Sequence, residues 1–265
     1  RIGHGNANGA DINGGGLRVS SSAAVVTVSN SRFHDNHSNS MGGAIHLSSL
    51  SVSSTLTNCV FENNISGSAG GAVATGSGAI TVYITDCVFR NNSSTSANSA
   101  YGGGAVRCHF SSAVITGSLF VGNTSSGYGG AVAVVSATST AAWATIDRCT
   151  FSGNSSAFGG ALYASREGTG AVTVNMKNSI LWTNTEIEIH TSGSVAMNVS
   201  YSNVSGGWGG TGNISLNPLY VGGADYSLQS GSPAIDAGDP SSPQDQDGTQ
   251  VDMGAIYYDQ RTYVP

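Results

Sequence analysis

Two short motifs stand side by side in residues 56–73, Leu56-Thr57-Asn58-Cys59-Val60-Phe61-Glu62-Asn63-Asn64-Ile65-Ser66-Gly67-Ser68-Ala69-Gly70-Gly71-Ala72-Val73. The first is Phe-x-x-Asn, and the second is Gly-Gly-Ala followed by an aliphatic residue. Phe-x-x-Asn recurs along the chain at intervals of 28 to 31 residues, and the second motif follows each complete copy. A period of this length indicates a repeat architecture in which each copy forms one structural unit.

The copies define two columns of equivalent residues. The aromatic column is Phe33, Phe61, Phe89, Phe120 and Phe151. The amide column is Asn36, Asn64, Asn92, Asn123, Asn154 and Asn184, where the last copy begins with Leu181 instead of Phe. If each copy is one coil, equivalent residues stack at ~4.8 Å. We therefore expect a stack of Phe rings in the core and a ladder of Asn amides that also bond to buried turn backbone.

The repeat predicts an all-β fold, a right-handed parallel β-helix of about nine coils with an irregular C-terminal cap. We expect residues 1–215 to form the repeats, and residues 216–265 to form a C-terminal coil and an acidic capping segment of the same domain. A helical fold is excluded because the apolar residues lack a 3.6-residue period and the chain contains 38 glycines. A β-propeller is a weaker alternative, since its blades span about 40–50 residues.

The composition of the chain excludes some classes of binding partner. Charged residues make up only 9% of the chain, and the net charge is −6. Nucleic acids and anionic membranes call for a basic face, so neither is expected as a partner. No apolar run approaches the ~20 residues of a transmembrane helix. The first four residues lack the features of a signal peptide, which suggests a processed product or a fragment.

The C-terminal segment carries a group of acidic residues, among them Asp236, Asp239, Asp245, Asp247 and Asp252. The run from Asp245 to Gly248 has alternating oxygen ligands followed by a turn glycine. Calcium prefers six to eight oxygen ligands from such loops, although the spacing is not that of an EF-hand. The segment is therefore either a calcium site or a solvated polar cap that blunts the open edge of the last coil.

Catalytic and metal-binding patterns are sparse elsewhere. The expected outward position after Gly-Gly-Ala carries no acid; it holds His46, Ala74, Arg107, Ala133 and Tyr163. Glu186 and Glu188 alternate on one strand and could form a carboxylate pair, as glycoside hydrolysis requires. His34 and His37 flank a turn and are close enough to share a metal, but a solvated turn explains them better. No other zinc or copper pattern is present.

Three of the four cysteines fall in one column of small residues, at Cys59, Cys87 and Cys149. Buried thiols behave as small apolar groups, which accounts for the column without a disulfide. Cys59 and Cys87 lie on adjacent coils, but in-register neighbours are poorly oriented for a disulfide.

The alternation of Gly-Gly-Ala-[Ile/Val/Leu] with Phe-x-x-Asn resembles the polymorphic outer-membrane-protein repeat of bacterial autotransporters, over residues 14–184. The order of Asn217-Pro218-Leu219-Tyr220, Gly231-Ser232-Pro233-Ala234-Ile235-Asp236 and Asp252-Met253-Gly254-Ala255 resembles the end of bacterial right-handed β-helix-repeat proteins. The resemblance implies an exported solenoid, located extracellularly or on the outer cell surface. It does not imply a single activity.

We therefore expect a non-enzymatic structural or adhesive β-solenoid whose partners are glycans or cell surfaces. Apart from the calcium ion considered above, no cofactor is expected. One alternative is a self-assembling extracellular fibre subunit, stacked end to end into filaments. The other is a polysaccharide lyase or glycoside hydrolase, which would need converging carboxylates or a calcium ion on an exposed sheet.

Overall fold

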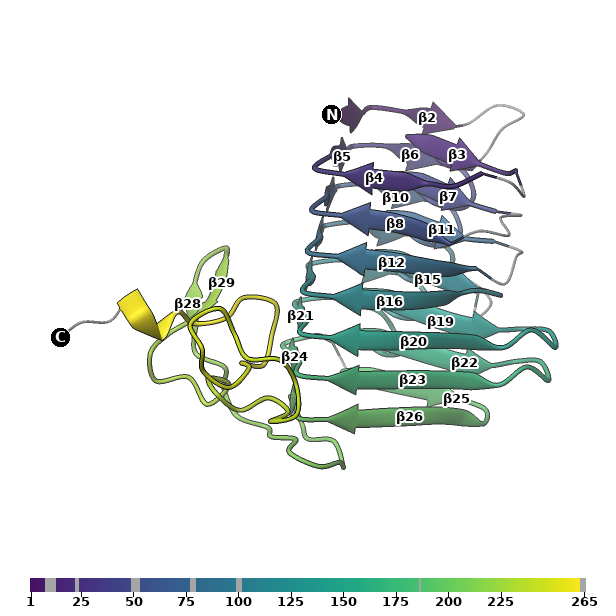
Figure 1. Cartoon of the computed structure of the whole chain (residues 1–265). Coiled ribbons are helices and arrows are strands. Elements are labelled where there is room, and N and C mark those ends of the chain that lie inside the picture. Colours follow the sequence, from purple (N-terminus) through teal and green to yellow (C-terminus); the bar gives the residue numbers. More distant parts are fainter. Residues whose placement is uncertain are drawn as a thin grey trace.

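The computed structural model describes residues 1–7, 13–21, 24–48, 53–76, 80–98, 102–185 and 187–262. Over these residues the chain is an all-β solenoid in which strands of consecutive coils pair in parallel (Figure 1). Four parallel sheets run along the solenoid, and the chain visits them in the order sheet 1, sheet 2, sheet 3 and sheet 4. After β18 no further strand of the described residues joins sheet 2, so the later coils pass from sheet 1 to sheet 3.

The four sheets are defined by their strands. Sheet 1 carries the Phe column and contains β1 (Ile2–Gly3), β5 (Arg32–His34), β9 (Val60–Glu62), β13 (Val88–Arg90), β17 (Leu119–Val121), β21 (Thr150–Ser152), β24 (Ile180–Trp182) and β27 (Asn203–Val204). Sheet 2 is short and contains β2 (Asn6–Ala7), β6 (His37–Ser38), β10 (Ile65–Ser66), β14 (Ser93–Ser94) and β18 (Thr124–Ser125). Sheet 3 follows the Gly-Gly pairs and contains β3 (Leu17–Val19), β7 (Ile45–Leu47), β11 (Val73–Thr75), β15 (Val106–His109), β19 (Val132–Ser136), β22 (Leu162–Arg166) and β25 (Ile189–Ser192). Sheet 4 contains β4 (Thr27–Ser29), β8 (Ser54–Thr57), β12 (Thr81–Thr85), β16 (Ser112–Thr116), β20 (Ala142–Asp147), β23 (Val172–Lys177) and β26 (Val195–Ser200).

Three corners per coil require a left-handed backbone, which explains the abundance of Gly, Asn and Asp. The corner between sheets 4 and 1 has positive φ at Asn30, Asn58, Asp86, Gly117, Arg148, Asn178 and Tyr201. The corner between sheets 1 and 2 has positive φ at His4, Asp35, Asn63, Asn91, Gly122, Gly153 and Thr183. The first glycine of each Gly-Gly pair forms the third corner. The second glycine is needed for space, because a Cβ on Gly71 would overlap the carbonyl oxygen of Gly104.

The core fills the inside of the coils with stacked columns. Phe33 pairs with Phe61, and the register continues through Phe89, Phe120 and Phe151 to Leu181. Adjacent Phe rings are stacked nearly parallel, with centroids 4.7 to 5.1 Å apart. A second column crosses sheet 4 and consists of Val28, Leu56, Ile84, Ile115, Ile146 and Met176. All four cysteines, which belong to the described residues, are buried free thiols.

The prediction of about nine coils is too high, because the longest sheet has eight strands. After β27 the chain leaves the stack and forms loops, the antiparallel pair β28 (Tyr220–Gly222) and β29 (Asp225–Leu228), and the short 3-10 helix η1 (Gln260–Thr262). This segment lies beside the solenoid (Figure 1). Ile180 of sheet 1 packs there with Leu228, Ala234 and Met253. Residues 216–262 therefore cover the side of the solenoid rather than its end.

Hydrogen bonds join the segment to the coils. The backbone amide of Ala255 donates to Thr150 Oγ1 at 2.9 Å, and the amide of Asp239 donates to Asn178 Oδ1 at 2.6 Å. Lys177 Nζ donates to Asp239 Oδ2 at 3.0 Å. Among the described residues there is no helix that is both long and apolar enough to cross a membrane.

Candidate functional site

The Asn column forms a continuous amide ladder along one edge of the core. Asn92 shows the pattern: its Nδ2 donates to Asn123 Oδ1 at 2.9 Å and to the carbonyl of Phe61 at 3.0 Å. Its Oδ1 accepts from the backbone amide and from Nδ2 of Asn64, at 3.0 and 2.9 Å. Each interior amide thus satisfies backbone groups that would otherwise be buried without partners. The ladder is a structural element and offers no free group to a ligand.

Glu188 ends this ladder, a role that the sequence did not reveal. Asn184 Nδ2 donates to Glu188 Oε2 at 2.5 Å, in the place where the Oδ1 of a further ladder Asn would accept. The sequence contains only indirect evidence for this role of Glu188. No Phe-x-x-Asn copy follows Asn184, so the Asn184 amide needs an acceptor other than a further ladder Asn. The possible partner Glu186 lies outside the described residues, so the carboxylate pair stays a prediction.

The surroundings of Glu188 perturb its carboxyl group. The side chain is buried beside a pocket of about 400 Å³ that is also lined by Asn184, Ile187 and Trp208. Burial raises the pKa of Glu188 to about 7, against the weaker opposing effect of the hydrogen bond from Asn184. Trp208 packs against the core next to this pocket.

The raised pKa of Glu188 makes stability depend on pH. Between pH 4.5, the ordinary pKa of a glutamate, and about pH 7, the folded chain keeps a proton on Glu188 that the unfolded chain has released. The free energy of unfolding therefore falls as the pH rises through this window, and the loss is complete above about pH 7. Relative to Glu188→Gln, the wild-type free energy of unfolding should fall by about 2 kcal/mol between pH 5.5 and 8.5. The difference between the two proteins is the useful quantity, because burial depresses the pKa of His46 and His109, which act in the opposite direction.

Guanidinium unfolding of both proteins at the two pH values measures this difference. The variant is a close control because a Gln amide oxygen can still accept from Asn184. Parallel pH dependence in both proteins would contradict a buried, protonatable Glu188.

The five aspartates of the predicted calcium site are spread over loops that organise the C-terminal segment. Among the described residues, no three of their carboxylates lie within 4.8 Å of one another. Most of their oxygens accept hydrogen bonds from the chain itself; the donors are Gln260 for Asp236, Ser241 and Lys177 for Asp239, the Asp252 amide for Asp245, Thr249 and Gln260 for Asp247, and the Asp236 and Tyr258 amides for Asp252. Burial raises the pKa of Asp252 to about 6. Calcium binding at these residues stays a prediction.

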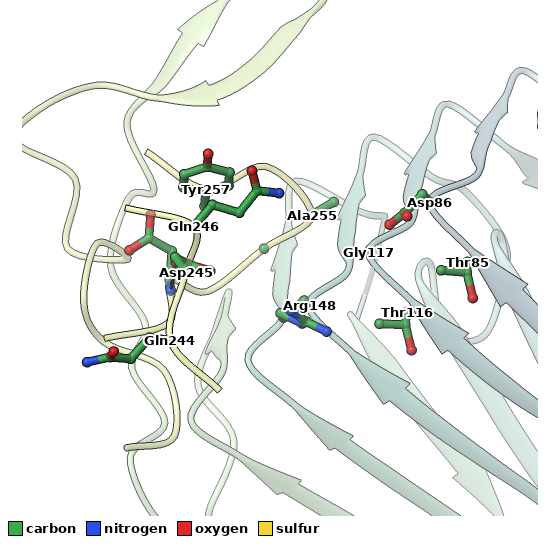
Figure 2. A pocket seen from close by; sticks show the side chains of 12 residues that line it. Thr85, Asp86, Thr116, Gly117, Arg148, Gln244, Asp245, Gln246, Ala255 and Tyr257 are labelled. Carbon is green, nitrogen blue, oxygen red and sulfur yellow. Dashed lines mark hydrogen bonds between the residues drawn. The ribbon is translucent and has the colours of Figure 1, made fainter. Parts of the chain in front are cut away.

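A pocket of about 430 Å³ separates the acidic segment from the corners of the solenoid (Figure 2). Asp245 and Tyr257 line it from the C-terminal segment, and Asp86 and Arg148 line it from the corner between sheets 4 and 1. Arg148 Nε lies 3.7 Å from Asp147 Oδ2, outside normal hydrogen-bond range. The pocket carries charges of both signs, so its field does not select one class of ionic ligand.

The outward column of sheet 3 is not an exposed face. His46, Ala74, Arg107, Ala133 and Tyr163 are all buried, although their positions after the Gly-Gly turns point away from the core. Near the C-terminal coils, the ring of Tyr128 covers Tyr163, with centroids 4.7 Å apart. Phe158 stacks on Tyr128 at 4.9 Å. Tyr128 and Phe158 are stacked face to face, whereas Tyr163 is tilted against Tyr128 and buried, so Tyr128 and Tyr163 are poorly placed to stack on a ligand.

Sheet 4 presents the open face of the solenoid, with strands β4 to β26 running as parallel rungs (Figure 1). Its outward side chains are mostly hydroxyls and amides. One column of them consists of Thr55, Tyr83, Val114, Thr145, Asn175 and Asn198. Asn198 Nδ2 donates to Asn175 Oδ1 at 2.9 Å on the exposed surface. Further along, Thr145, Lys177 and Asn198 line a shallow hollow of about 300 Å³.

Two aromatic side chains project from this face. Tyr83 on β12 is 42% exposed, and Trp143 on β20 is 37% exposed. Their strands are separated by β16, so the rings are offset by about 10 Å along the solenoid axis. We name the outward residues of sheet 4, with Tyr83 and Trp143, the aromatic–hydroxyl face.

One coil of the solenoid is similar to a known protein repeat. Residues 148–165 match the Chlamydia polymorphic membrane protein repeat. The matched residues begin at the Arg148 corner and include Phe151, Asn154 and the Gly159-Gly160 turn, so they contain both motifs of one coil. One coil of this β-solenoid is therefore similar to the repeat of the polymorphic membrane proteins. No curated protein and no solved structure matches the chain.

Proposed function

We propose that this protein is a non-enzymatic adhesive solenoid of the cell exterior, and that its aromatic–hydroxyl face binds neutral glycans. The observation that carries the proposal is the exposure of Tyr83 and Trp143 on an open sheet of Thr, Ser and Asn side chains. The similarity of one coil to a repeat of outer-membrane surface proteins supports the location.

The chemistry of the face suits an uncharged sugar chain. Aromatic rings offer flat apolar surfaces against which the C–H face of a sugar ring can pack. Hydroxyl and amide groups both donate and accept hydrogen bonds, as sugar hydroxyls do. The central part of the face, from β12 to the middle of β20, carries no formal charge on its outward side chains. An extended glycan running obliquely across β12, β16 and β20 could reach both rings, because the column of Tyr83 continues to Thr145, two residues after Trp143 on the same strand.

Glycan-array binding of the wild-type protein, followed by titration of the best ligand, tests the proposal. The double variant Tyr83→Ala/Trp143→Ala should weaken binding about tenfold or more, because both stacking contacts are lost. Phe158→Ala is the matched control: Phe158 is 41% exposed but lies over sheet 3, and its removal should leave the affinity unchanged. Absence of glycan binding, or equal losses in both variants, would contradict the proposal.

The same sample separates the alternatives. Filaments at high protein concentration would favour the fibre subunit, and turnover of a polysaccharide would favour an enzyme. Loss of filaments with a chelator would implicate calcium.

A further inference from the structure

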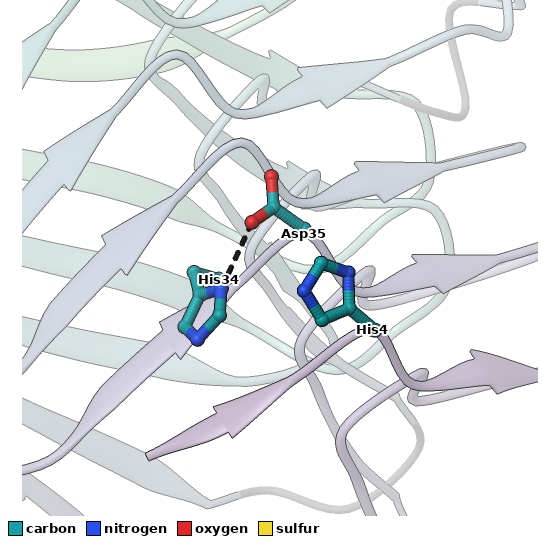
Figure 3. A group of neighbouring side chains, drawn as sticks. All are labelled: His4, His34 and Asp35. Carbon is teal, nitrogen blue, oxygen red and sulfur yellow. Dashed lines mark hydrogen bonds and ion pairs between the residues drawn. The ribbon is translucent and has the colours of Figure 1, made fainter.

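Three potential metal ligands from two coils meet at the corner between sheets 1 and 2 (Figure 3). His4 follows β1 in the first coil, His34 ends β5 in the second coil, and Asp35 forms the corner directly after it. Gly3 pairs with His34 in the parallel register, so the His4 corner stacks over the Asp35 corner. The fold therefore brings together side chains that are 30 residues apart in the sequence.

The geometry is that of a site needing only small adjustment. One ligand atom from each of the three residues lies within 4.8 Å of the other two. His34 Nδ1 is 2.8 Å from Asp35 Oδ2, and the His4 and His34 rings are 5.4 Å apart and nearly perpendicular. Ligand atoms around a tetrahedral zinc ion are about 3.3 Å apart. Side-chain rotations that shift the ligand atoms by roughly 1 Å would therefore complete the site. His4 and Asp35 are exposed, which gives an ion direct access.

The donor set selects the class of metal. Two imidazole nitrogens and one carboxylate oxygen suit zinc and its late first-row neighbours, whereas calcium takes oxygen ligands only. A fourth position remains for water.

We propose that His4, His34 and Asp35 bind one zinc-class divalent ion, which ties the first coil of the solenoid to the second. The spacing of His34 and His37 suggested a different pair. His37 instead lies on β6, where its Nδ1 is 3.4 Å from Asn6 Oδ1, and it is not part of the three-residue group. The proposal is independent of glycan binding.

The test is calorimetric titration of the metal-free protein with Zn²⁺, together with the visible absorption spectrum after titration with Co²⁺. We expect one ion per chain and the intense bands of four-coordinate cobalt. His4→Ala, His34→Ala and Asp35→Asn should each weaken binding at least about tenfold. Asp35→Asn fits the backbone, because Asn63 and Asn91 occupy the same left-handed corner in the next two coils. His37→Ala is the nearby control and should bind as the wild type does.

A second readout follows because the bound ion would link the first coil to the second. Zinc should slow hydrogen exchange of the His4 amide, which donates to the carbonyl of His34, in the wild type but not in Asp35→Asn. Circular dichroism in EDTA checks that each variant folds without metal. The proposal is overturned if the wild type binds no zinc, if the three variants retain wild-type affinity, or if His37→Ala loses binding equally.

Discussion

Replacing Asn92 with Ala should lower the free energy of unfolding by about 4 kcal/mol or more. The side chain is fully buried and takes part in four hydrogen bonds with the two neighbouring coils. Its removal leaves the amide of Asn64, the carbonyl of Phe61 and the Oδ1 of Asn123 without these partners. Buried polar groups without partners each cost about 1–3 kcal/mol, and no neighbouring side chain can replace the amide.

Urea unfolding of the variant and the wild type measures this loss. Asn175→Ala is the matched control, because Asn175 also belongs to a stacked amide pair but lies exposed on sheet 4. Its removal should change stability by less than about 0.5 kcal/mol. Similar losses in the two variants would show that burial of the ladder is not what stabilises the coils.

Phe120→Ala should destabilise the solenoid by about 3–5 kcal/mol. Phe120 lies between Phe89 and Phe151, with ring centroids 4.7 Å away on each side, and its side chain is fully buried. The parallel strands hold their spacing through backbone hydrogen bonds, so the neighbouring rings cannot close the gap. The cost therefore includes both the lost burial and the cavity that remains.

Thermal and denaturant unfolding check this second loss against Phe158→Ala. Phe158 is also stacked on an aromatic ring, but it is partly exposed, and its removal should cost less than about 1.5 kcal/mol. A small effect of Phe120→Ala would mean that the Phe column is not the main source of core stability.

The fold could be predicted because each coil carries two recurring residues, a Phe and an Asn, at a fixed spacing from each other. Phe61 and Asn64 are three residues apart on one coil, and both types recur at the same spacing in the next coil. One register therefore satisfies the aromatic and the amide column together, and a slip by one residue would break both. The C-terminal segment, residues 216–262, contains no such recurring residues. The placement of residues 216–262 depends on contacts of Ile180 and Thr150 with segments more than 40 residues away.

The candidate sites were less predictable, for reasons of geometry. His4, His34 and Asp35 become neighbours through the stacking of two corners, which a scan of local spacing does not reveal. The outward position of Arg107 predicted exposure, but burial depends on what covers a sheet as well as on alternation along the strand. Glu188 was noticed as an acid, yet its role follows from the unmet need of Asn184 for an acceptor.

The most direct test of the proposed function is an NMR titration that follows the three tryptophan indole N–H signals as a glycan from the array is added. Trp143 lies on the aromatic–hydroxyl face, Trp182 packs against the C-terminal segment, and Trp208 lines the pocket at the last coil. The account predicts that the signal of Trp143 shifts and that those of Trp182 and Trp208 stay in place. A shift of Trp208 with Trp143 unchanged would move the binding site to the pocket beside Glu188 and contradict the account.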